Sequence, residues 1–341
     1  MLGDAAWYGA LLVATAVAAD ALLRWLVEIA PQRVVLDIPN SRSLHQQPTP
    51  RGGGLAIVLV VLAIQAIAYA LLPLAVILAM TGWTAAAGLA FIGWYDDRHS
   101  LSPSVRLLAQ LLVASGCVIA VGQAIGLVTD LVGVCVGAVS VIAFVWLINL
   151  YNFMDGSDGL AGTQAFTAAF CGGLLALLQG NWTIAVIASA IAGGCAGFLR
   201  WNWAPAKIFM GDVGSYFLGA EFGFLILYTT AVTHNGWYWL ILLSPFITDA
   251  SLTLLRRLLH VKDWYAAHKT HVYQLLIQSG RSHAQVAVAV GAFVMFVAGP
   301  CAWFSVRIPS GALAATFATY GLTATIWFYL HCRVHSDGDS A

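Results

Sequence analysis

Carboxylate and amide side chains gather in four short segments of a chain that is otherwise strongly apolar. These segments are Asp96-Asp97, residues 149–159, residues 211–215 and residues 268–271. Ionised carboxylates at the rim of a membrane are costly unless a metal ion, a cationic partner or water compensates their charge. Counting hydrophobic spans from the N-terminus puts all four segments on the same side of a membrane. We therefore expect them to form one composite active site.

The adjacent pair Asp96-Asp97 closes one apolar span. Two neighbouring carboxylates repel each other unless a cation or a proton lies near them, which favours a cation-binding role. A plainer interpretation is a solvated loop in which Ser102 or Ser104 caps the following helix. The pair alone leaves both interpretations open.

Residues 149–159 carry two asparagines and two aspartates between apolar spans. Asn149 and Asn152 are three positions apart, as are Asp155 and Asp158, so on a helical turn each pair would face one way. The Asp-Gly steps at 155–156 and 158–159 permit tight turns and expose N–H groups that can approach a phosphate. Asp-Gly is also an ordinary turn signal. A turn does not require this many polar side chains, however, and we predict a functional loop.

Asp212 stands where the eighth apolar span should begin, directly after Gly211. An aspartate in that place can cap its own helix. A helix N-terminus also attracts phosphate, and Mg2+ prefers one or two carboxylates together with phosphate oxygens. Asp212 can therefore ligate Mg2+ at the same place, and the two interpretations are compatible.

The largest loop on this side spans residues 256–283 and is rich in basic and aromatic side chains. Such side chains suit an anionic nucleotide, through pairing with phosphate and stacking on the base. A zinc site could be imagined from His268 and His271, but no cysteine or further closely spaced histidine accompanies them. We expect His260 and His283 to be solvated and without a role.

The overall composition indicates a membrane protein. Hydrophobic residues make up 60% of the 341-residue chain, charged residues only 9%, and the mean hydropathy is +0.84. A soluble enzyme carries far more surface charge. The net charge of zero and the absence of a basic run argue against nucleic acid as a partner. The six cysteines form no CxxC pair and are expected to be small packing residues.

Apolar stretches of membrane-spanning length recur about eleven times along the chain. Their approximate extents are 5–29, 54–72, 74–95, 105–123, 128–148, 160–179, 182–199, 214–232, 237–255, 284–305 and 311–331. Residues 1–29 lack a basic n-region and a cleavage site, so we expect a retained first helix. The sequence therefore predicts an all-α polytopic membrane protein, with a single integral membrane domain over residues 1–341.

The basic residues predict the orientation of these spans. All lysines and arginines except Arg24 and Arg307 fall in loops after odd-numbered spans, in the adjoining helix ends or in the tail. By the positive-inside rule those loops are cytoplasmic, which places the N-terminus outside and the C-terminus inside. The four polar segments should then face the cytoplasm.

Taken together, the polar segments resemble those of the polyprenyl-phosphate N-acetylhexosamine-1-phosphate transferases. That family includes the muramoyl-pentapeptide translocases and the enzymes that initiate O-antigen, enterobacterial common antigen and teichoic acid linkage synthesis. The similarity follows the family's order through residues 37–43, 48–54, Asp96-Asp97, 149–162, 209–215 and the histidine segment. It spans nearly the whole chain, and the segment 149–162 is its most specific part.

The resemblance implies transfer of a sugar 1-phosphate from a UDP-N-acetylhexosamine to undecaprenyl phosphate, with release of UMP. It implies Mg2+ as the cofactor, with Mn2+ as an alternative. The metal ligands carried over from the family are Asp212, Asp97 and Asn152. The catalytic residues are Asp96, Asp97, Asp155 and Asp158, and the substrate-binding residues are Arg51, Asn149, Asn152, His268, Lys269 and His271.

Two departures from the family's pattern bear on the donor sugar. Lys269 and Thr270 interrupt a histidine run found in some branches, and Arg98-His99-Ser100 follows the acid pair where several branches carry another acid or a lysine. These changes resemble the O-antigen-initiating branch, whose donors are 6-deoxy or other N-acetylhexosamines. The resemblance also implies a bacterial inner-membrane location, lipopolysaccharide or other cell-wall biogenesis as the pathway, and leaves a homodimer open.

Two other classes of protein remain as alternatives. A transporter would also be polytopic, and Asp20, Glu221 and Asp249 lie within predicted spans. Transporters place their ligands near the midplane at broken helices, however, whereas most carboxylates here gather on one side. A noncatalytic sensor or scaffold would not need so many aligned Asp and Asn residues. Asp249, close to Pro245, is either a contributor to the site or a helix-packing acid.

Overall fold

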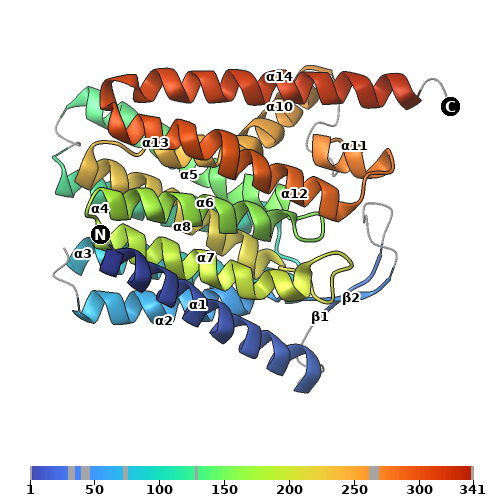
Figure 1. Ribbon diagram of the computed structural model, residues 1–341, viewed down its shortest axis with the longest axis horizontal. Coiled ribbons are helices and arrows are strands. Elements are labelled where there is room, and N and C mark those ends of the chain that lie inside the picture. The colour runs from blue at the N-terminus through green and yellow to red at the C-terminus, as the bar shows by residue number, and fades with distance from the viewer. Residues whose placement is uncertain are drawn as a thin grey trace.

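The structure, a computed structural model, is a bundle of long helices that run from one end of the molecule to the other (Figure 1). It describes residues 2–29, 35–39, 47–71, 76–126, 130–260 and 269–338. Its first half comprises α1 (Leu2–Arg24), the π-helix η1 (Trp25–Ile29), β1 (Val35–Asp37), β2 (Thr49–Arg51), α2 (Gly54–Leu71), α3 (Val76–His99), α4 (Pro103–Ala124) and α5 (Leu131–Met154). Its second half comprises α6 (Leu160–Leu178), α7 (Trp182–Asn202), α8 (Asp212–Thr233), α9 (Trp237–Leu242), α10 (Ser244–His260), α11 (Val272–Gln278), α12 (His283–Phe293), η3 (Val294–Ala298), α13 (Gly299–Arg307), η4 (Pro309–Gly311) and α14 (Ala312–Gly338).

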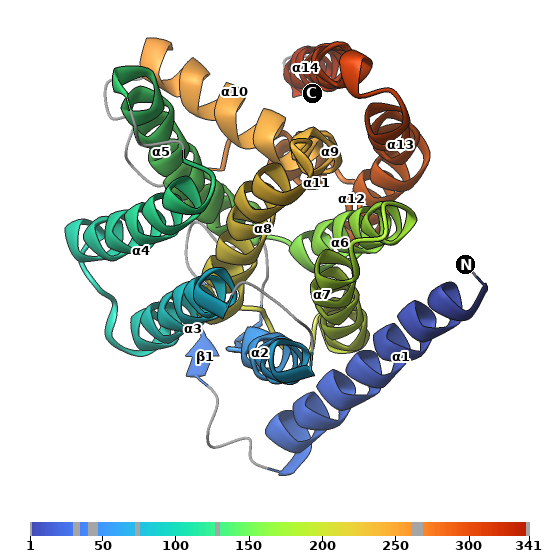
Figure 2. The ribbon, with the colours of Figure 1, turned by 90° about the vertical axis from the view of Figure 1, so that its left-hand side faces the viewer.

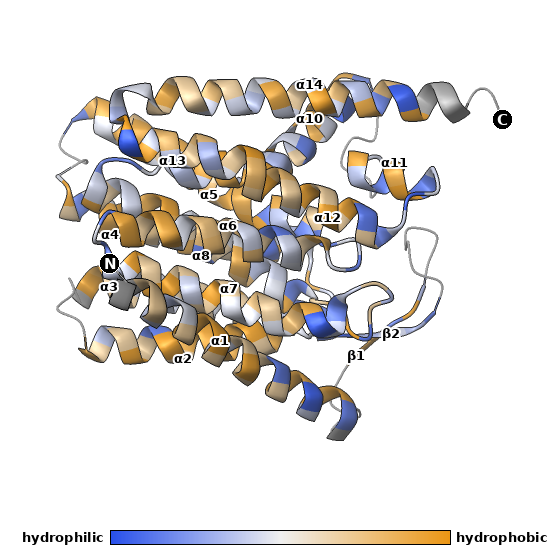
Figure 3. Ribbon diagram, viewed as in Figure 1, coloured by the Kyte–Doolittle hydropathy of each residue, from blue (hydrophilic) through white to orange (hydrophobic). Residues whose placement is uncertain are grey.

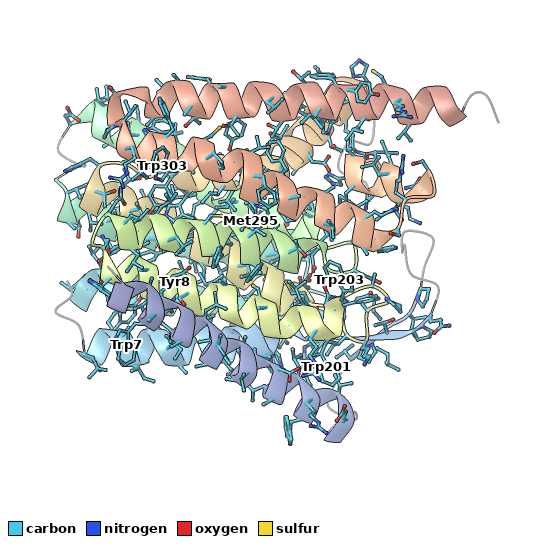
Figure 4. The ribbon with its side chains drawn as sticks, in the orientation of Figure 1. Trp7, Tyr8, Trp201, Trp203, Met295 and Trp303 are labelled. Atoms are coloured by element: carbon cyan, nitrogen blue, oxygen red, sulfur yellow. The ribbon has the colours of Figure 1, made fainter. Side chains whose placement is uncertain are left out.

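Ten helical segments of the described chain are long and apolar enough to cross a membrane. This confirms the predicted class, an all-α multi-pass membrane protein. The segments lie roughly parallel, and hydrophobic residues dominate the middle of the bundle (Figure 3). Trp7 and Trp303 lie toward one end and Trp203 toward the other (Figure 4), as expected for the two interfaces of a bilayer, where tryptophan is enriched.

The ninth predicted span, 237–255, is not one helix but two. The short helix α9 ends at Leu242, and α10 begins at Ser244. Leu243 between them has φ −90° and ψ 0°, outside the helical range. Pro245 follows at once, and a proline cannot donate its backbone nitrogen to the preceding turn, so the chain breaks there. α9 and α10 together still return the chain from the far end of α8 to the end where α11 lies (Figure 1).

Helix α8 lies at the centre of the bundle (Figure 2). It packs against α2, α3, α4, α5 and α9. Glycines of α8 allow it to approach α5 closely. A Cβ at Gly219 would lie only 2.6 Å from Ile148 Cα, and a Cβ at Gly223 would lie 3.0 Å from the Phe144 side chain, so a larger residue would not fit at either position without a shift. Small residues of this kind let membrane helices approach each other. The first turn of α8 is thereby fixed in the middle of one end of the molecule.

That end, here called the polar end, holds β1, β2, α11 and the connections at 100–102, 155–159 and 203–211 (Figure 1). Strands β1 and β2 pair antiparallel, with Val35 opposite Arg51. Hydrophilic residues are concentrated there, on α11 and on the last turns of α1 and α14 (Figure 3). The polar end is the one that the positive-inside rule assigns to the cytoplasm, and its orientation in a membrane stays a prediction.

The carboxylates that the transporter alternative would use are each engaged by neighbours. Glu221 of α8 accepts hydrogen bonds at both oxygens from Gln65 Nε2 of α2, each 2.8 Å long. Asp20 accepts from Arg200 and from the Trp201 indole, at 2.7 and 2.8 Å. These contacts join helices, which gives the two acids a packing role.

Candidate active site at the polar end

Asp97 caps the central helix across a large gap in sequence. Its Oδ1 accepts from the backbone N of Asp212 at 3.1 Å, and its Oδ2 accepts from the backbone N of Val213 at 3.2 Å. The residue in the N-cap position of α8 is Gly211, with φ +76°, and Asp212 is the first helical residue. The expectation that Asp212 caps its own helix is therefore wrong. A carboxylate from α3 satisfies the free N–H groups and the positive helix end instead.

A glycine contact brings Arg51 to the same carboxylate. The backbone N of Gly53 donates to Phe209 O, and that of Gly54 donates to Met210 O, both at 2.9 Å. A Cβ at Gly54 would overlap the Cα of Gly214, so only glycine permits this approach. The preceding Arg51 then donates to the backbone oxygen of Asp97, and its Nε lies 3.7 Å from Asp97 Oδ1.

Asn152 and Asp155 reach this centre from the end of α5. Asn152 Nδ2 donates to Asp212 Oδ1 at 2.7 Å and to Ser215 Oγ at 3.2 Å. Burial raises the pKa of the Asp155 carboxyl well above its ordinary value, and the nearby Asp212 and Asp97 carboxyls raise it further. Asp97, Asp155, Asp212 and Asn152 thus form one group, here called the acid cluster. Three of its members are acids that repel one another when ionised.

Asp96 faces the neighbouring helix α4. Its Oδ2 lies 3.2 Å from Arg106 Nη1 and accepts from the Tyr216 hydroxyl at 3.2 Å, while its Oδ1 accepts from Leu101 N at 2.7 Å. The capping half of the plainer interpretation also holds, because Ser102 Oγ accepts from Val105 N at the start of α4. The two members of the acid pair therefore have different surroundings.

The expected pairing of side chains within 149–159 is wrong. Asn149 Nδ2 donates to Gln110 Oε1 of α4 at 2.7 Å, away from Asp212. Asp158 lies in the turn after α5, and its Oδ2 accepts from Ala206 N at 3.0 Å. Three residues on a helix leave a rotation of about 60° between side chains, and Asp155 and Asp158 do not share a helix at all.

The histidine segment docks on the end of α5 through α11. His271 is the N-cap of α11, and its Nδ1 lies 3.8 Å from Asp249 Oδ1. The next residue but one, Tyr273, donates its hydroxyl to Phe153 O at 3.0 Å. Lys269 accepts from Gln278 Nε2 at its backbone oxygen. His268 lies outside the described residues.

Asp249 is the residue that holds α11 in place. Its Oδ1 accepts from Val272 N at 2.9 Å and from the Trp327 indole at 3.0 Å, and its Oδ2 accepts from Tyr273 N at 3.3 Å. It thereby joins α10, α11 and α14. The helix-packing interpretation of Asp249 is thus confirmed, and the same contacts place the histidine segment.

Four further residues lie at the candidate site and were not singled out as site residues from the sequence. They are Arg106, Tyr216, Tyr273 and His283. Arg106 could have been found, since a basic residue follows the acid pair within one helical turn of the next span. The expectation that His283 is merely solvated is wrong, because its Nδ1 lies 3.1 Å from Ser157 Oγ. No sequence signal connects residues so far apart.

The acid cluster fits Mg2+ by its donor chemistry. Mg2+ takes oxygen ligands and usually uses one or two carboxylates, with phosphate oxygens and water completing the shell. Asn152 Nδ2 donates to Asp212 and Ser215, and the amide oxygen of Asn152 can therefore serve as a metal ligand. Within the described part of the chain, no three His, Cys, Asp or Glu residues form a ready-made metal cage. The donors therefore fit a metal that binds together with a phosphate ligand.

The fold and the site define a multi-pass membrane protein with a carboxylate centre at one end of the bundle. The profile of glycosyl transferase family 4 matches residues 77–230, from the start of α3 to near the end of α8. This stretch contains every member of the acid cluster.

Relatives match over a longer range. A probable undecaprenyl-phosphate N-acetylglucosaminyl 1-phosphate transferase of Bacillus subtilis is 30% identical over 269 residues, covering 75% of this chain and 73% of the relative. A decaprenyl-phosphate N-acetylglucosaminephosphotransferase of Mycolicibacterium smegmatis is 31% identical over 316 residues, covering 80% and 76%. The undecaprenyl-phosphate alpha-N-acetylglucosaminyl 1-phosphate transferase of Escherichia coli K12 is 25% identical over 310 residues, covering 85% and 82%. The chain belongs to this family of polyprenyl-phosphate hexosamine-1-phosphate transferases, which confirms the resemblance.

Proposed function

We propose that the protein transfers an N-acetylhexosamine 1-phosphate from a UDP-sugar to undecaprenyl phosphate in a bacterial inner membrane. The products are undecaprenyl-diphosphate-sugar and UMP. The observation that carries the proposal is the contact of Asp97 and Asn152 with the first turn of α8, because it joins three polar segments around Asp212. The names of the relatives, which state transfer of N-acetylglucosamine phosphate to a polyprenyl phosphate, support the reaction class.

The chain's own groups are suited to hold a diphosphate. Arg51 and Arg106 flank the acid cluster, and both side chains are about one-third exposed, at 28% and 32%. Guanidinium groups bind phosphate oxygens through charge-assisted hydrogen bonds. Lys269 and His271 come directly before α11, His271 as its N-cap, and the nucleotide is proposed to extend toward them. Asp212, Asp97 and Asn152 would hold Mg2+, which, when bound, neutralises charge on the phosphoryl oxygens.

Asp96 is proposed to position the acceptor rather than to act as a general base. It is held by Arg106, Tyr216 and the backbone of Leu101. A phosphate monoester has its second pKa near 6, so the acceptor phosphate is largely ionised at neutral pH and needs little help from a base. Catalysis then comes mainly from alignment of the two phosphates.

The polyprenyl tail is proposed to lie between helices at the polar end. Helices α5 and α10 are neighbours. They expose Phe153, Leu255, Leu258 and Leu259 close to that end. An apolar tail along these side chains would leave its phosphate at the rim of the membrane, beside Asp155 and Arg106. The donor is proposed to be a UDP-N-acetylhexosamine of the O-antigen type, including 6-deoxy sugars.

The test combines purified protein, undecaprenyl phosphate, Mg2+ and a panel of UDP-N-acetylhexosamines, with lipid products identified by mass spectrometry. The released nucleotide is separated by chromatography in a single-turnover reaction. Attack on the sugar-bearing phosphorus keeps the anomeric C–O bond and releases UMP. Release of UDP with a monophosphate-linked sugar would show attack at the anomeric carbon and overturn the proposal.

A further inference from the structure

His283, the first residue of α12, contacts the loop between α5 and α6. Its Nδ1 lies 3.1 Å from Ser157 Oγ, 3.2 Å from the backbone N of Asp158 and 3.7 Å from Asp158 Oδ1. A backbone N–H can only donate, so Nδ1 must be the acceptor in the contact with Asp158 N. The ring therefore carries its proton on Nε2 in this arrangement.

The ring projects from a rigid element. Ser282 caps α12 in a capping box, in which Gln285 N donates to Ser282 Oγ at 3.2 Å and Ser282 N donates to Gln285 Oε1 at 3.0 Å. Further along, a Cβ at Gly291 would lie 2.7 Å from the Thr163 side chain of α6, so the two helices are closely packed. The position of His283 Nδ1 is thus set by two packed helices and not by a loop.

The loop it contacts is held from a second direction by the end of α7 and the connection that follows it. Gly159 N donates to Asn202 Oδ1 at 2.9 Å, and Ala206 N donates to Asp158 Oδ2 at 3.0 Å. Asp155, at the start of the same loop, is near Asp97 and Asp212. The loop is therefore anchored by contacts that lie outside the acid cluster. His283 is the anchor on the α12 side.

We propose that His283 is a positioning residue for the transferase reaction proposed above. It accepts from Asp158 N, fixes the backbone of residues 157–158, and so holds Asp155 beside Asp97 and Asp212. It does not touch the reacting phosphates. The inference rests on the proposed function, which supplies the reaction whose rate depends on this loop.

The experiment compares His283→Asn with His283→Gln. Asparagine places an amide oxygen at the same distance from Cβ as Nδ1, whereas glutamine places it one bond further away, although both residues are neutral amides. We expect His283→Asn to keep kcat within about threefold of the wild type. We expect His283→Gln and His283→Ala to lower kcat about tenfold, the rate equivalent of one ordinary hydrogen bond. KM for the nucleotide sugar should change less than kcat.

His260→Ala is the matched control. His260 is an exposed histidine of α10 whose Nδ1 lies 3.0 Å from the backbone oxygen of Arg256 in its own helix. Its replacement should leave kcat, KM and the melting temperature unchanged. Melting temperatures of the three His283 variants are measured beside it in the same detergent.

The outcomes separate this inference from the proposed function. No turnover by the wild type would remove the proposed function itself. If the wild type is active and His283→Gln is equally active, the inference is overturned. Equal losses in His283→Asn and His283→Gln, accompanied by lower melting temperatures, would also overturn it, because the ring would then act only by packing.

Discussion

Asp96, Asp97 and Asp212 at the polar end differ in the groups that they contact. Each oxygen of Asp97 accepts one of the first N–H groups of α8, and each keeps a further lone pair. Asp212, at the first turn of α8, accepts a hydrogen bond from Asn152 Nδ2 at its Oδ1. Asp96 is balanced by Arg106. We propose Asp212 as the principal metal ligand among the three, because it begins the central helix and contacts Asn152.

At this scale we predict that Asp212→Asn abolishes Mg2+-dependent turnover while the protein stays folded in detergent. The substitution removes the charge at nearly constant shape, so the loss reflects ligation and not a cavity. The rate should fall about 100-fold or more, the upper range for disturbing a metal site. Turnover is measured against Mg2+ concentration.

Asp130→Asn serves as its control. Asp130 caps α5 by accepting from Gly133 N at 2.8 Å, and asparagine caps a helix as well as aspartate does. Activity and melting temperature should not change. Full activity of Asp212→Asn at limiting Mg2+ would eliminate Asp212 as a principal ligand.

The raised pKa of Asp155 predicts how the stability of the metal-free protein depends on pH. The folded protein binds the Asp155 proton more tightly than the unfolded chain does. The resulting stability is full below the ordinary aspartate pKa and is lost as pH rises through the raised value. Without divalent metal, the melting temperature of the wild type should therefore fall with rising pH above about 4. Asp155→Asn should flatten this dependence, and an unchanged slope in that variant would contradict the assignment.

At the scale of elements, the close approach of α2 to α8 depends on Gly54 and Gly214. Neither residue has a side chain, so the two backbones can come into contact. A Cβ at Gly54 would overlap Gly214 Cα, and backbone atoms cannot move aside as a flexible side chain can. This contact also places Arg51 next to Asp97. The start of α2 and the start of α8 therefore act as one unit.

We predict that Gly54→Ala destabilises the protein by about 1–3 kcal/mol, the usual cost of overpacking, and lowers turnover by displacing Arg51. The control is Gly116→Ala in α4, where a Cβ would meet nothing within 4 Å. Alanine is the better helix former, so this variant should be more stable by about 0.5–1 kcal/mol. The melting temperatures of both variants and of the wild type are measured in the same detergent. Equal effects at both positions would show that close packing at Gly54 is unimportant.

At the scale of the whole molecule, we predict that the polar end faces the cytoplasm, since most lysines and arginines of the described residues lie in its connections and helix ends. Single cysteines are placed at Ser104 on the polar end and at Ser310 on the opposite end, both of which are exposed. The exposed native Cys135 and Cys332 are replaced by alanine. An impermeant maleimide applied to intact cells should label only the Ser310→Cys variant. Labelling of Ser104→Cys without permeabilisation would reverse the topology.

Local features of the sequence determined the class of protein, the approximate positions of ten spans, the family and the oxygen-rich side chains of the candidate site. Hydropathy, helix signals and motif spacing all act over a few residues, so they can be read without the fold. Ser102 as the cap of α4 is one such local feature, and it is confirmed. Pro245 marked a weak point in the ninth span, but whether the helix would bend or break depended on its surroundings.

Tertiary structure alone decided which polar side chains meet. Asp97 caps a helix that begins 115 residues later, His283 holds a turn 125 residues earlier, and Asn149 and Asn152 contact different helices. Contacts at such separations depend on how each helix is rotated and how closely it packs. In this protein glycines at 54, 214, 219 and 223 set that packing, because residues without side chains let backbones approach and thereby fix which face of each helix turns toward the site.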